Sequence, residues 1–391
     1  MSLPDAGHPT TAPPHRPRRR AGWAVLAATL AVAAAGVGGY LLGQFTAPHP
    51  AFDPLWLRAY TDRPLDTAAP GDGFWIAGYY VDYDSDSLES VRLNAPHMDQ
   101  VIVFGHGFDW EGNAVGKDQT LIRGVTNQQK RVLLFGNFSD GGFDPELAHR
   151  ILTDPVVQER AMMSILAEAD RLGVAGVQID FENVPPEDRD AYTQFLRRLK
   201  DRLEPLGLTL SVAAAAKTSD TNTGWGGATD YEAIGQIVDY FYIMAYDEHW
   251  LGGEPGPVAS LGWVERVVRY ATGVMPSQKI LLGVPFYGYE WSLEPELGTE
   301  TNAAYGPGRM QRRAEEFGAE VVWDPVVGEN KAVFLTDEGE RIAWYPDERS
   351  LDAKLRLAYQ YNLKGIAVWR VGLEPDEWWH RMGAFRLNPE T

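Results

Sequence analysis

The chain has 391 residues, of which 45% are apolar and 23% charged, a composition typical of a folded globular protein. Its formal net charge of −19 argues against a nucleic-acid-binding protein, because such proteins depend on basic surfaces. The chain has no cysteine, which excludes disulfides, thiolate nucleophiles, cysteine-ligated zinc and iron–sulfur clusters.

The first forty residues predict a membrane anchor. Residues 1–20 are rich in Pro, Thr and Ala and end in arginines, which predicts a disordered cytoplasmic tail. Residues 21–43 carry no charge, and at about 1.5 Å per residue a helix of this length would span a bilayer core. The basic flank places the N-terminus in the cytoplasm. We therefore expect a single-pass cell-membrane protein, with residues 44–72 as a linker to an extracytoplasmic domain.

Two alternatives remain for this segment. A cleaved signal peptide would give a secreted protein, although its apolar region usually has about 7–15 residues and this one is longer. The segment could also be a buried helix of a soluble protein, which the preceding arginines disfavour.

Residues 73–388 alternate short apolar runs with stretches at helical spacing. The helical stretches are Pro155–Leu172, Pro186–Leu206, Ser260–Ala271 and Ser350–Tyr361. Eight runs predict strands: Phe74–Tyr80, Gln100–Phe108, Arg131–Phe138, Gly176–Phe181, Leu208–Ala214, Tyr240–Ala245, Lys279–Phe286 and Gly365–Val371. Eight strands alternating with helices predict an α/β fold, a parallel (β/α)8 TIM barrel.

An insertion is expected between the seventh strand and its helix, over residues 292–347. Within it, Lys331–Leu335 and Glu340–Trp344 flank a turn at Thr336–Gly339, which is typical of a β-hairpin. The pattern predicts a small α+β subdomain on the rim of the barrel.

Acidic residues follow the fourth predicted strand, at the end of the barrel where active sites form. Gln178, Asp180 and Glu182 alternate along the chain and therefore share one face of the strand. Because a neighbouring carboxylate raises a carboxyl pKa, Glu182 is a candidate general acid. The alternative is that Asp180 and Glu182 only cap the following turn.

Aromatic and acidic side chains also end other strands. Aromatic faces can stack on sugar rings and carboxyl groups can transfer protons to a glycosidic oxygen, although each residue alone could be an ordinary core-edge residue. The catalytic candidates are Glu182, Asp180, Tyr246 and Asp247. The candidates for substrate binding are Gln178, Met244, Tyr287, Trp369, Tyr80 and Trp250.

These segments resemble glycoside hydrolase family 18, which contains chitinases and related N-acetylglucosaminidases. The family pattern D-G-x-D-x-D-x-E corresponds to Ala175–Glu182, where only the last Asp and the Glu are kept. Its M-x-Y-D corresponds to Met244–Asp247, its G-x-P-x-Y-G to Gly283–Gly288, and its strand-eight Trp to Trp369. The stretch Ile179–Arg189 is most similar to the spore-germination type of peptidoglycan hydrolase.

The resemblance implies retaining, substrate-assisted hydrolysis of β-1,4 bonds in N-acetylglucosamine polymers, either peptidoglycan or chitin. It implies that Glu182 protonates the leaving oxygen and that Asp180 orients the N-acetyl group, whose carbonyl oxygen is the nucleophile. It also implies that Tyr246 bonds the acetamido oxygen, Asp247 holds the distorted sugar and Trp369 stacks beneath it. Gln178 replaces a family Asp and cannot ionise. We interpret this replacement as a change in the properties of the site rather than a loss of activity.

Two other functions are alternatives to this one. A non-catalytic, lectin-like barrel would need the aromatic residues but not both Asp180 and Glu182. A metal-dependent enzyme is disfavoured because the eight histidines form no H-x-x-x-H or comparable cluster. We therefore expect no metal and no cofactor, a polysaccharide partner, no nucleic-acid partner, and a monomer.

Overall fold

The computed structural model describes residues 73–389, apart from gaps at 117–121, 123–125, 127–129, 140–141, 295–297 and 300. The expected tail, membrane span and linker therefore lie outside the described residues. Within the described part, no helix combines the length and the apolar character needed to cross a membrane.

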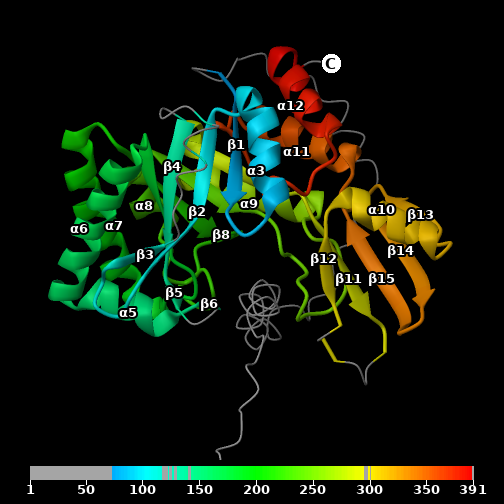
Figure 1. Cartoon of the computed structure of the whole chain (residues 1–391), viewed down its shortest axis with the longest axis horizontal. Coiled ribbons are helices and arrows are strands. Elements are labelled where there is room, and N and C mark those ends of the chain that lie inside the picture. Colours follow the sequence, from blue (N-terminus) through cyan, green and yellow to red (C-terminus); the bar gives the residue numbers. More distant parts are fainter. Residues whose placement is uncertain are drawn as a thin grey trace, which may run out of the picture.

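A closed parallel barrel forms the centre of the molecule (Figure 1). Neighbouring strands pair in chain order, and β1 pairs in parallel with both the second and the last strand, which closes the sheet. The barrel strands are β1 (Trp75–Val81), β2 (Gln100–Phe108), β4 (Arg131–Gly136), β7 (Gly176–Asp180), β8 (Thr209–Ala215), β9 (Tyr240–Met244), β10 (Ile280–Pro285) and β16 (Gly365–Trp369). Each overlaps one of the eight predicted strands, so the predicted TIM barrel is confirmed.

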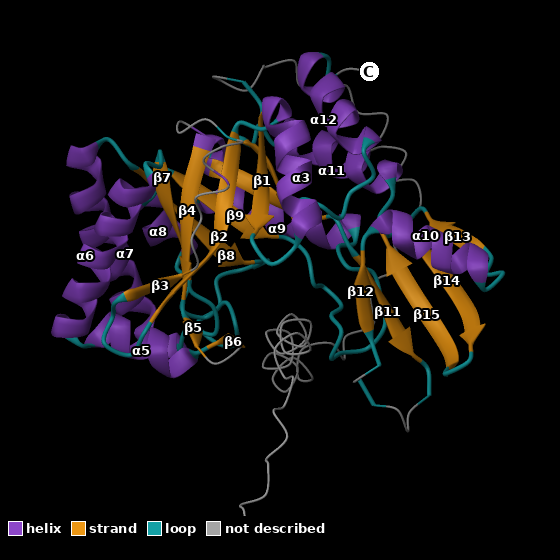
Figure 2. Ribbon diagram, in the orientation of Figure 1, coloured by secondary structure: helices purple, strands orange, loops and turns teal. Residues whose placement is uncertain are grey.

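Helices surround the barrel, as Figure 2 shows. They are α3 (Ser85–Asn94), α5 (Pro145–Thr153), α6 (Pro155–Leu172), α7 (Arg189–Leu203), α8 (Tyr231–Ile237), α9 (Leu261–Val274), α11 (Glu348–Gln360) and α12 (Glu377–Leu387). The α6 helix has the predicted bounds because Asp154 caps its first turn and the left-handed Gly173 ends it. The α7 helix is shorter than predicted, since 3-10 turns at Pro186–Asp188 and Glu204–Leu206 flank it.

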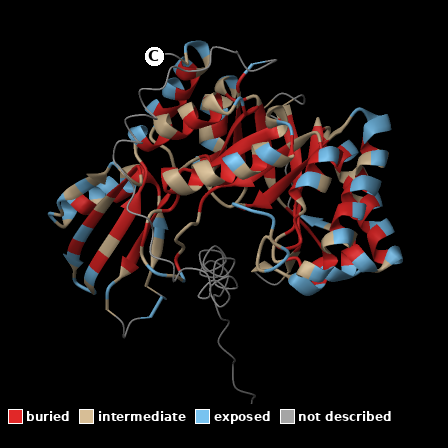
Figure 3. Ribbon diagram, turned by 180° about the vertical axis from the view of Figure 1, so that it is seen from behind, coloured by how far each residue is buried: buried red, intermediate tan, exposed pale blue. Residues whose placement is uncertain are grey.

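Two apolar layers hold the barrel together. The larger lies between strands and helices, where Ile165, Leu196 and Leu355 are fully buried. The smaller fills the interior of the barrel and includes Tyr79 and Tyr242. Figure 3 shows that buried residues follow the strands and the inward faces of the helices. Because side chains alternate along a strand, adjacent residues enter different layers.

The insertion forms a second sheet beside the barrel. Its strand order is β12 (Ala303–Tyr305), β11 (Gly288–Ser292), β15 (Gly339–Tyr345), β14 (Glu329–Thr336) and β13 (Val321–Asp324), all antiparallel. The α10 helix (Pro307–Glu316) packs Met310 and Ala314 on one face of this sheet. In the hairpin, Thr336 pairs with Gly339 as the sequence predicts.

The subdomain begins at Gly288, before the expected residue 292. A side chain at Gly288 could not fit, because a Cβ there would lie 2.3 Å from the Cβ of Tyr345. The G-x-P-x-Y-G motif therefore ends in the first strand of the insertion. The described part of the chain also contains the short strands β3 (Ala114–Gly116), β5 (Phe138–Ser139) and β6 (Gly142–Phe143).

Candidate active site

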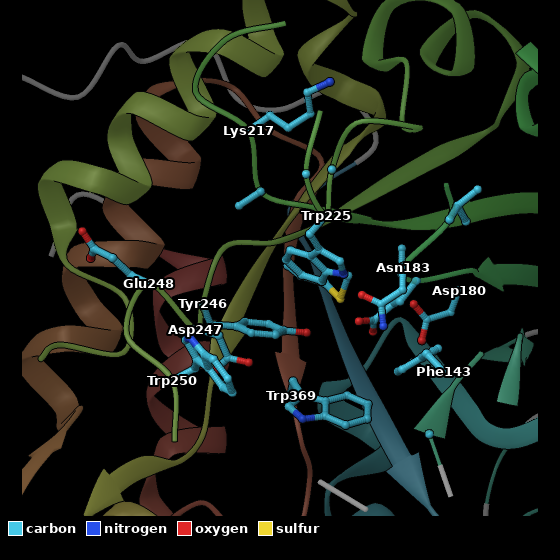
Figure 4. A pocket seen from close by; sticks show the side chains of 18 of the residues that line it. Phe143, Asp180, Asn183, Lys217, Trp225, Tyr246, Asp247, Glu248, Trp250 and Trp369 are labelled. Atoms are coloured by element: carbon cyan, nitrogen blue, oxygen red, sulfur yellow. The ribbon is translucent and has the colours of Figure 1, made fainter. Parts of the chain in front are cut away.

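A cavity of about 1350 Å³ opens at the carboxyl ends of the barrel strands. It contains most of the residues selected from the sequence, which the fold collects from β7, β9, β10, β16 and the loops that follow them. The predicted residues that line it are Asp180, Glu182, Met244, Tyr246, Asp247, Trp250, Tyr287 and Trp369. Figure 4 shows that Trp225, Tyr246, Asp180 and Trp369 lie around one space.

The backbone of Glu182 is fixed by the residue that directly follows the neighbouring strand β4. The side chain of the fully buried Asn137 accepts a hydrogen bond from the Glu182 N–H and donates one to the Glu182 carbonyl, each at 2.9 Å. Asn137 also donates to the carbonyl of Asp144 at 2.8 Å. The next residue, Asn183, has a φ of 55° and turns the chain away from the strand. The position of Glu182 is therefore set by two strands together.

The electrostatic environment favours the protonated form of Glu182. Burial raises its pKa well above the ordinary carboxyl value, and the nearby Asp180 and Asp247 raise it further. A hydrogen bond from Trp225 opposes this shift in the Glu182 pKa. A carboxyl group that stays protonated near neutral pH can donate its proton, so the site meets the requirement for a general acid.

Asp180 lies beside this acid. Burial raises the pKa of Asp180 to about 7. Its Oδ1 atom is buried and has no hydrogen-bond partner among the described residues. An unpaired buried acceptor next to the cavity suits a substrate N–H group, because leaving such an atom unsatisfied is costly.

Asp247 is held by two tyrosines, one between the seventh barrel strand β10 and the insertion and one in the first strand of the insertion. The hydroxyls of Tyr287 and Tyr289 donate to its Oδ1 at 2.5 and 2.7 Å. Burial raises the pKa of Asp247, while these two hydrogen bonds lower it. Asp247 has a left-handed φ of 60°, so the chain turns sharply at this residue.

Trp369 forms one wall of the cavity. Its ring contacts Tyr79 and Phe104 edge to face, with centroids 5.3 and 5.2 Å apart. Tyr246 lies beside Tyr287, with ring centroids 6.1 Å apart. These packing contacts fix the aromatic faces, which is what a rigid platform for a sugar ring requires.

Two residues that the sequence predicts as substrate contacts, Tyr80 and Gln178, do not line the cavity. Tyr80 packs in the outer layer against the helices, and its neighbour Tyr79 lines the cavity instead, because the strand alternation places Tyr79 inside. Gln178 is fully buried inside the barrel and does not line the cavity. Its amide donates to Ser211 Oγ at 3.3 Å, and the Tyr79 hydroxyl interacts with it.

The sequence analysis missed Trp225, which hydrogen-bonds Glu182. Trp225 lies in the loop after β8, where Lys217 donates to the carbonyls of Thr221 and Thr229 at 2.9 and 3.0 Å. The only signal in the sequence is a tryptophan among glycines in the segment that follows the predicted strand Leu208–Ala214. Over the ranges that the structure describes, no group of three or more His, Cys, Asp or Glu residues is placed to hold a metal ion.

Comparison with known proteins is consistent with this geometry. The profile of Glycosyl hydrolases family 18 matches residues 120–374. The cortical fragment-lytic enzyme of Bacillus subtilis is 34% identical over 313 residues, which cover 78% of this chain and 73% of that enzyme. Among solved structures, the spore cortex-lytic enzyme SleL of Bacillus cereus is 30% identical with a TM-score of 0.73, covering 80% of this chain and 74% of that one. A chitinase from Chromobacterium violaceum is 25% identical with a TM-score of 0.72, covering 80% and 99%. The chain therefore belongs to glycosyl hydrolase family 18 and is a glycosidase.

Proposed function

We propose that the protein hydrolyses β-1,4 bonds next to N-acetylglucosamine units, chiefly in peptidoglycan, with retention by substrate assistance. The observation that carries this proposal is the convergence of Asp180, Glu182 and Asp247 on one aromatic-walled cavity, with the pKa of Glu182 raised by burial and by the other two. The cortex-lytic and fragment-lytic names of the relatives support a cell-wall glycan as the substrate.

In the first step, Glu182 gives its proton to the glycosidic oxygen as the bond to the anomeric carbon breaks. The carbonyl oxygen of the substrate's own N-acetyl group attacks that carbon, which gives an oxazolinium ion and releases the protonated leaving group. Asp180 accepts a hydrogen bond from the acetamido N–H through its unpaired Oδ1 and stabilises the positive charge. The Tyr246 hydroxyl donates to the acetamido oxygen.

In the second step, the Glu182 carboxylate takes a proton from water. The resulting attack on the anomeric carbon opens the oxazolinium ring and restores the acetamido group. Two displacements at one carbon retain the configuration of the sugar. Asp247, fixed by Tyr287 and Tyr289, accepts a hydrogen bond from a hydroxyl of the distorted ring.

We further propose that residues 21–43 anchor the enzyme in the cell membrane with the barrel outside. The uncharged run and the arginines before it support this proposal. An enzyme tethered in this way acts on wall polymer close to the membrane.

The proposed activity is tested by mass spectrometry of products released from purified peptidoglycan and from chitin oligosaccharides by the full chain. We expect peptidoglycan fragments with N-acetylglucosamine at the new reducing end, formed first as the β-anomer. Fragments with N-acetylmuramic acid at the new reducing end would contradict the proposed cleavage site. Cleavage of chitin alone would contradict peptidoglycan as the substrate.

A further inference from the structure

A second cleft of about 540 Å³ adjoins the catalytic cavity. Ala304, Arg370 and Leu373 line both spaces, so the two meet without an intervening element. Arg370 directly follows Trp369, the aromatic wall of the catalytic cavity. A substrate that stacks on Trp369 can therefore extend its substituents into this second cleft. We call it the arginine cleft, after Arg309, Arg312 and Arg370.

Two of these guanidinium groups are available to a ligand. Arg309 and Arg312 are exposed on α10, and neither forms an ion pair with any residue that the structure describes. Arg309 lies 4.1 Å from the ring centre of Tyr305, which holds the guanidinium over the aromatic face. The neighbouring Arg313, by contrast, is fully engaged with Glu290 at 2.7 and 2.8 Å.

No acidic side chain of α10 offsets the charge of Arg309 at the amino end of this helix. Arg309 lies in the first turn of α10, which has no acidic residue and no side-chain cap at Gly306. The amino end of a helix carries partial positive charge, so a cation in the first turn is repelled by it. A carboxylate bound in the cleft would offset the partial positive charge of the helix end and the charges of the arginines.

The acidic residues of the cleft do not fill this role. Asp84 is paired with Arg370 at 2.7 Å. The Glu374 carboxylate accepts hydrogen bonds from Ser90, Trp379 and the backbone N–H groups of Gly372 and Leu373, so its oxygens are satisfied internally. Asp86 is exposed on α3 and lines the cleft. Its negative charge would repel a bound carboxylate.

We propose that the arginine cleft binds carboxylate groups that the substrate carries beside its glycan chain. Peptidoglycan bears such groups on its peptide substituents, and on the lactyl group wherever the peptide has been removed, whereas chitin bears none. The proposal rests on the proposed function and deepens it, because it makes the cleft the feature that selects peptidoglycan. In a chain of net charge −19, the arginines provide local attraction for a polymer that the rest of the surface repels.

The test measures binding to Glu182→Gln protein, which keeps the shape of the cavity but cannot act as the acid. The ligands are a peptide-bearing peptidoglycan fragment, the same fragment after enzymatic removal of its peptides, and a chitin oligosaccharide of equal length. We expect Arg309→Gln with Arg312→Gln to weaken binding of carboxylate-bearing fragments about 10-fold, as two exposed charge pairs imply, and to leave chitin binding unchanged. Asp86→Asn should tighten binding of the same fragments.

The matched control is Arg197→Gln, which removes one exposed guanidinium from the outer helix α7. An effect confined to the peptide-bearing fragment identifies peptide carboxylates, and an effect on the peptide-free fragment shows that the cleft also accepts the lactyl carboxylate, which is free only after the peptide is removed. Equal affinities with and without Arg309 and Arg312, or no binding of any carboxylate-bearing fragment, would overturn the proposal that the arginine cleft binds carboxylates. Failure of the wild-type enzyme to cleave peptidoglycan, with the arginine effect on binding intact, would overturn the proposed function alone.

Discussion

The Tyr289 hydroxyl donates a hydrogen bond of 2.7 Å to the Asp247 carboxylate. Tyr289 belongs to the first strand of the insertion, whereas Asp247 follows barrel strand β9. The insertion therefore contributes directly to the electrostatics of the candidate active site, in addition to forming its rim.

Replacing Tyr289 by Phe should raise the pKa of Asp247, because one of the two hydroxyls that lower it is lost. The fall in activity at acid pH should then begin at a higher pH. A hydrogen bond to a charged group contributes about 1.5–3 kcal/mol, so kcat/KM should drop roughly 10- to 100-fold. The pH profile of kcat/KM measures both effects.

The control for this variant is Tyr345→Phe, which removes a hydroxyl from the same sheet. Tyr345 donates to Gln311 at 3.0 Å, on the face that packs against α10. An equal loss of activity in the two variants would show that the insertion acts only through its stability.

Replacing Glu182 by Gln should abolish proton donation while keeping the size of the side chain. General acid–base groups typically contribute about 10²–10⁴-fold, so kcat should fall by at least that factor with glycan binding retained. Steady-state kinetics measure the fall in kcat, and binding of a chitin oligosaccharide shows whether glycan affinity is retained. Activity close to that of the wild type would mean that another group is the acid.

Replacing Asp180 by Asn should stabilise the folded protein at alkaline pH while reducing catalysis. Burial raises the Asp180 pKa from 3.8 to about 7, so the folded state holds this proton more tightly than the unfolded state does. Its stabilising contribution is complete below pH 3.8 and is lost as the pH rises through about 7. The neutral Asn avoids this loss. In urea unfolding, the Asn variant should exceed the wild type in free energy of unfolding by more at pH 8 than at pH 4. Equal gains at the two pH values would contradict the raised pKa of Asp180.

The full chain should remain in the membrane fraction of its host, and external protease should digest residues after Phe45 in intact cells. The reason is that residues 21–43 have the length and apolar character of a membrane span. A soluble mature form that begins near residue 45–50 would indicate a cleaved signal peptide instead.

The barrel could be predicted from the sequence because apolar runs and helical stretches alternate so regularly along it. The main motifs also placed Asp180, Glu182 and Asp247 correctly in the cavity, since strand ends converge in any such barrel. Tyr79 and Tyr80 were confused because adjacent tyrosines at a strand end fit either face equally well. Only the register of β1 with its neighbours decides between them.

Other parts of the site depend on contacts between residues that are distant in the sequence. Trp225 reaches Glu182 through a loop held by Lys217, and Asn137 fixes the Glu182 backbone from the end of another strand. Nothing in the spacing of these residues indicates that they meet. The arginine cleft likewise forms from α3, α10 and the chain after β16, which the fold alone brings together.

In the proposed mechanism, the substrate's acetamido group, and not a protein carboxylate, attacks the anomeric carbon. This step is tested most directly with a series of aryl glycosides whose N-acetyl group carries zero, one, two or three fluorine atoms. Fluorine withdraws electrons from the carbonyl oxygen and weakens it as a nucleophile. If the acetamido oxygen is the nucleophile, kcat/KM should fall steeply with each fluorine atom added, whereas rates independent of fluorination would contradict substrate assistance.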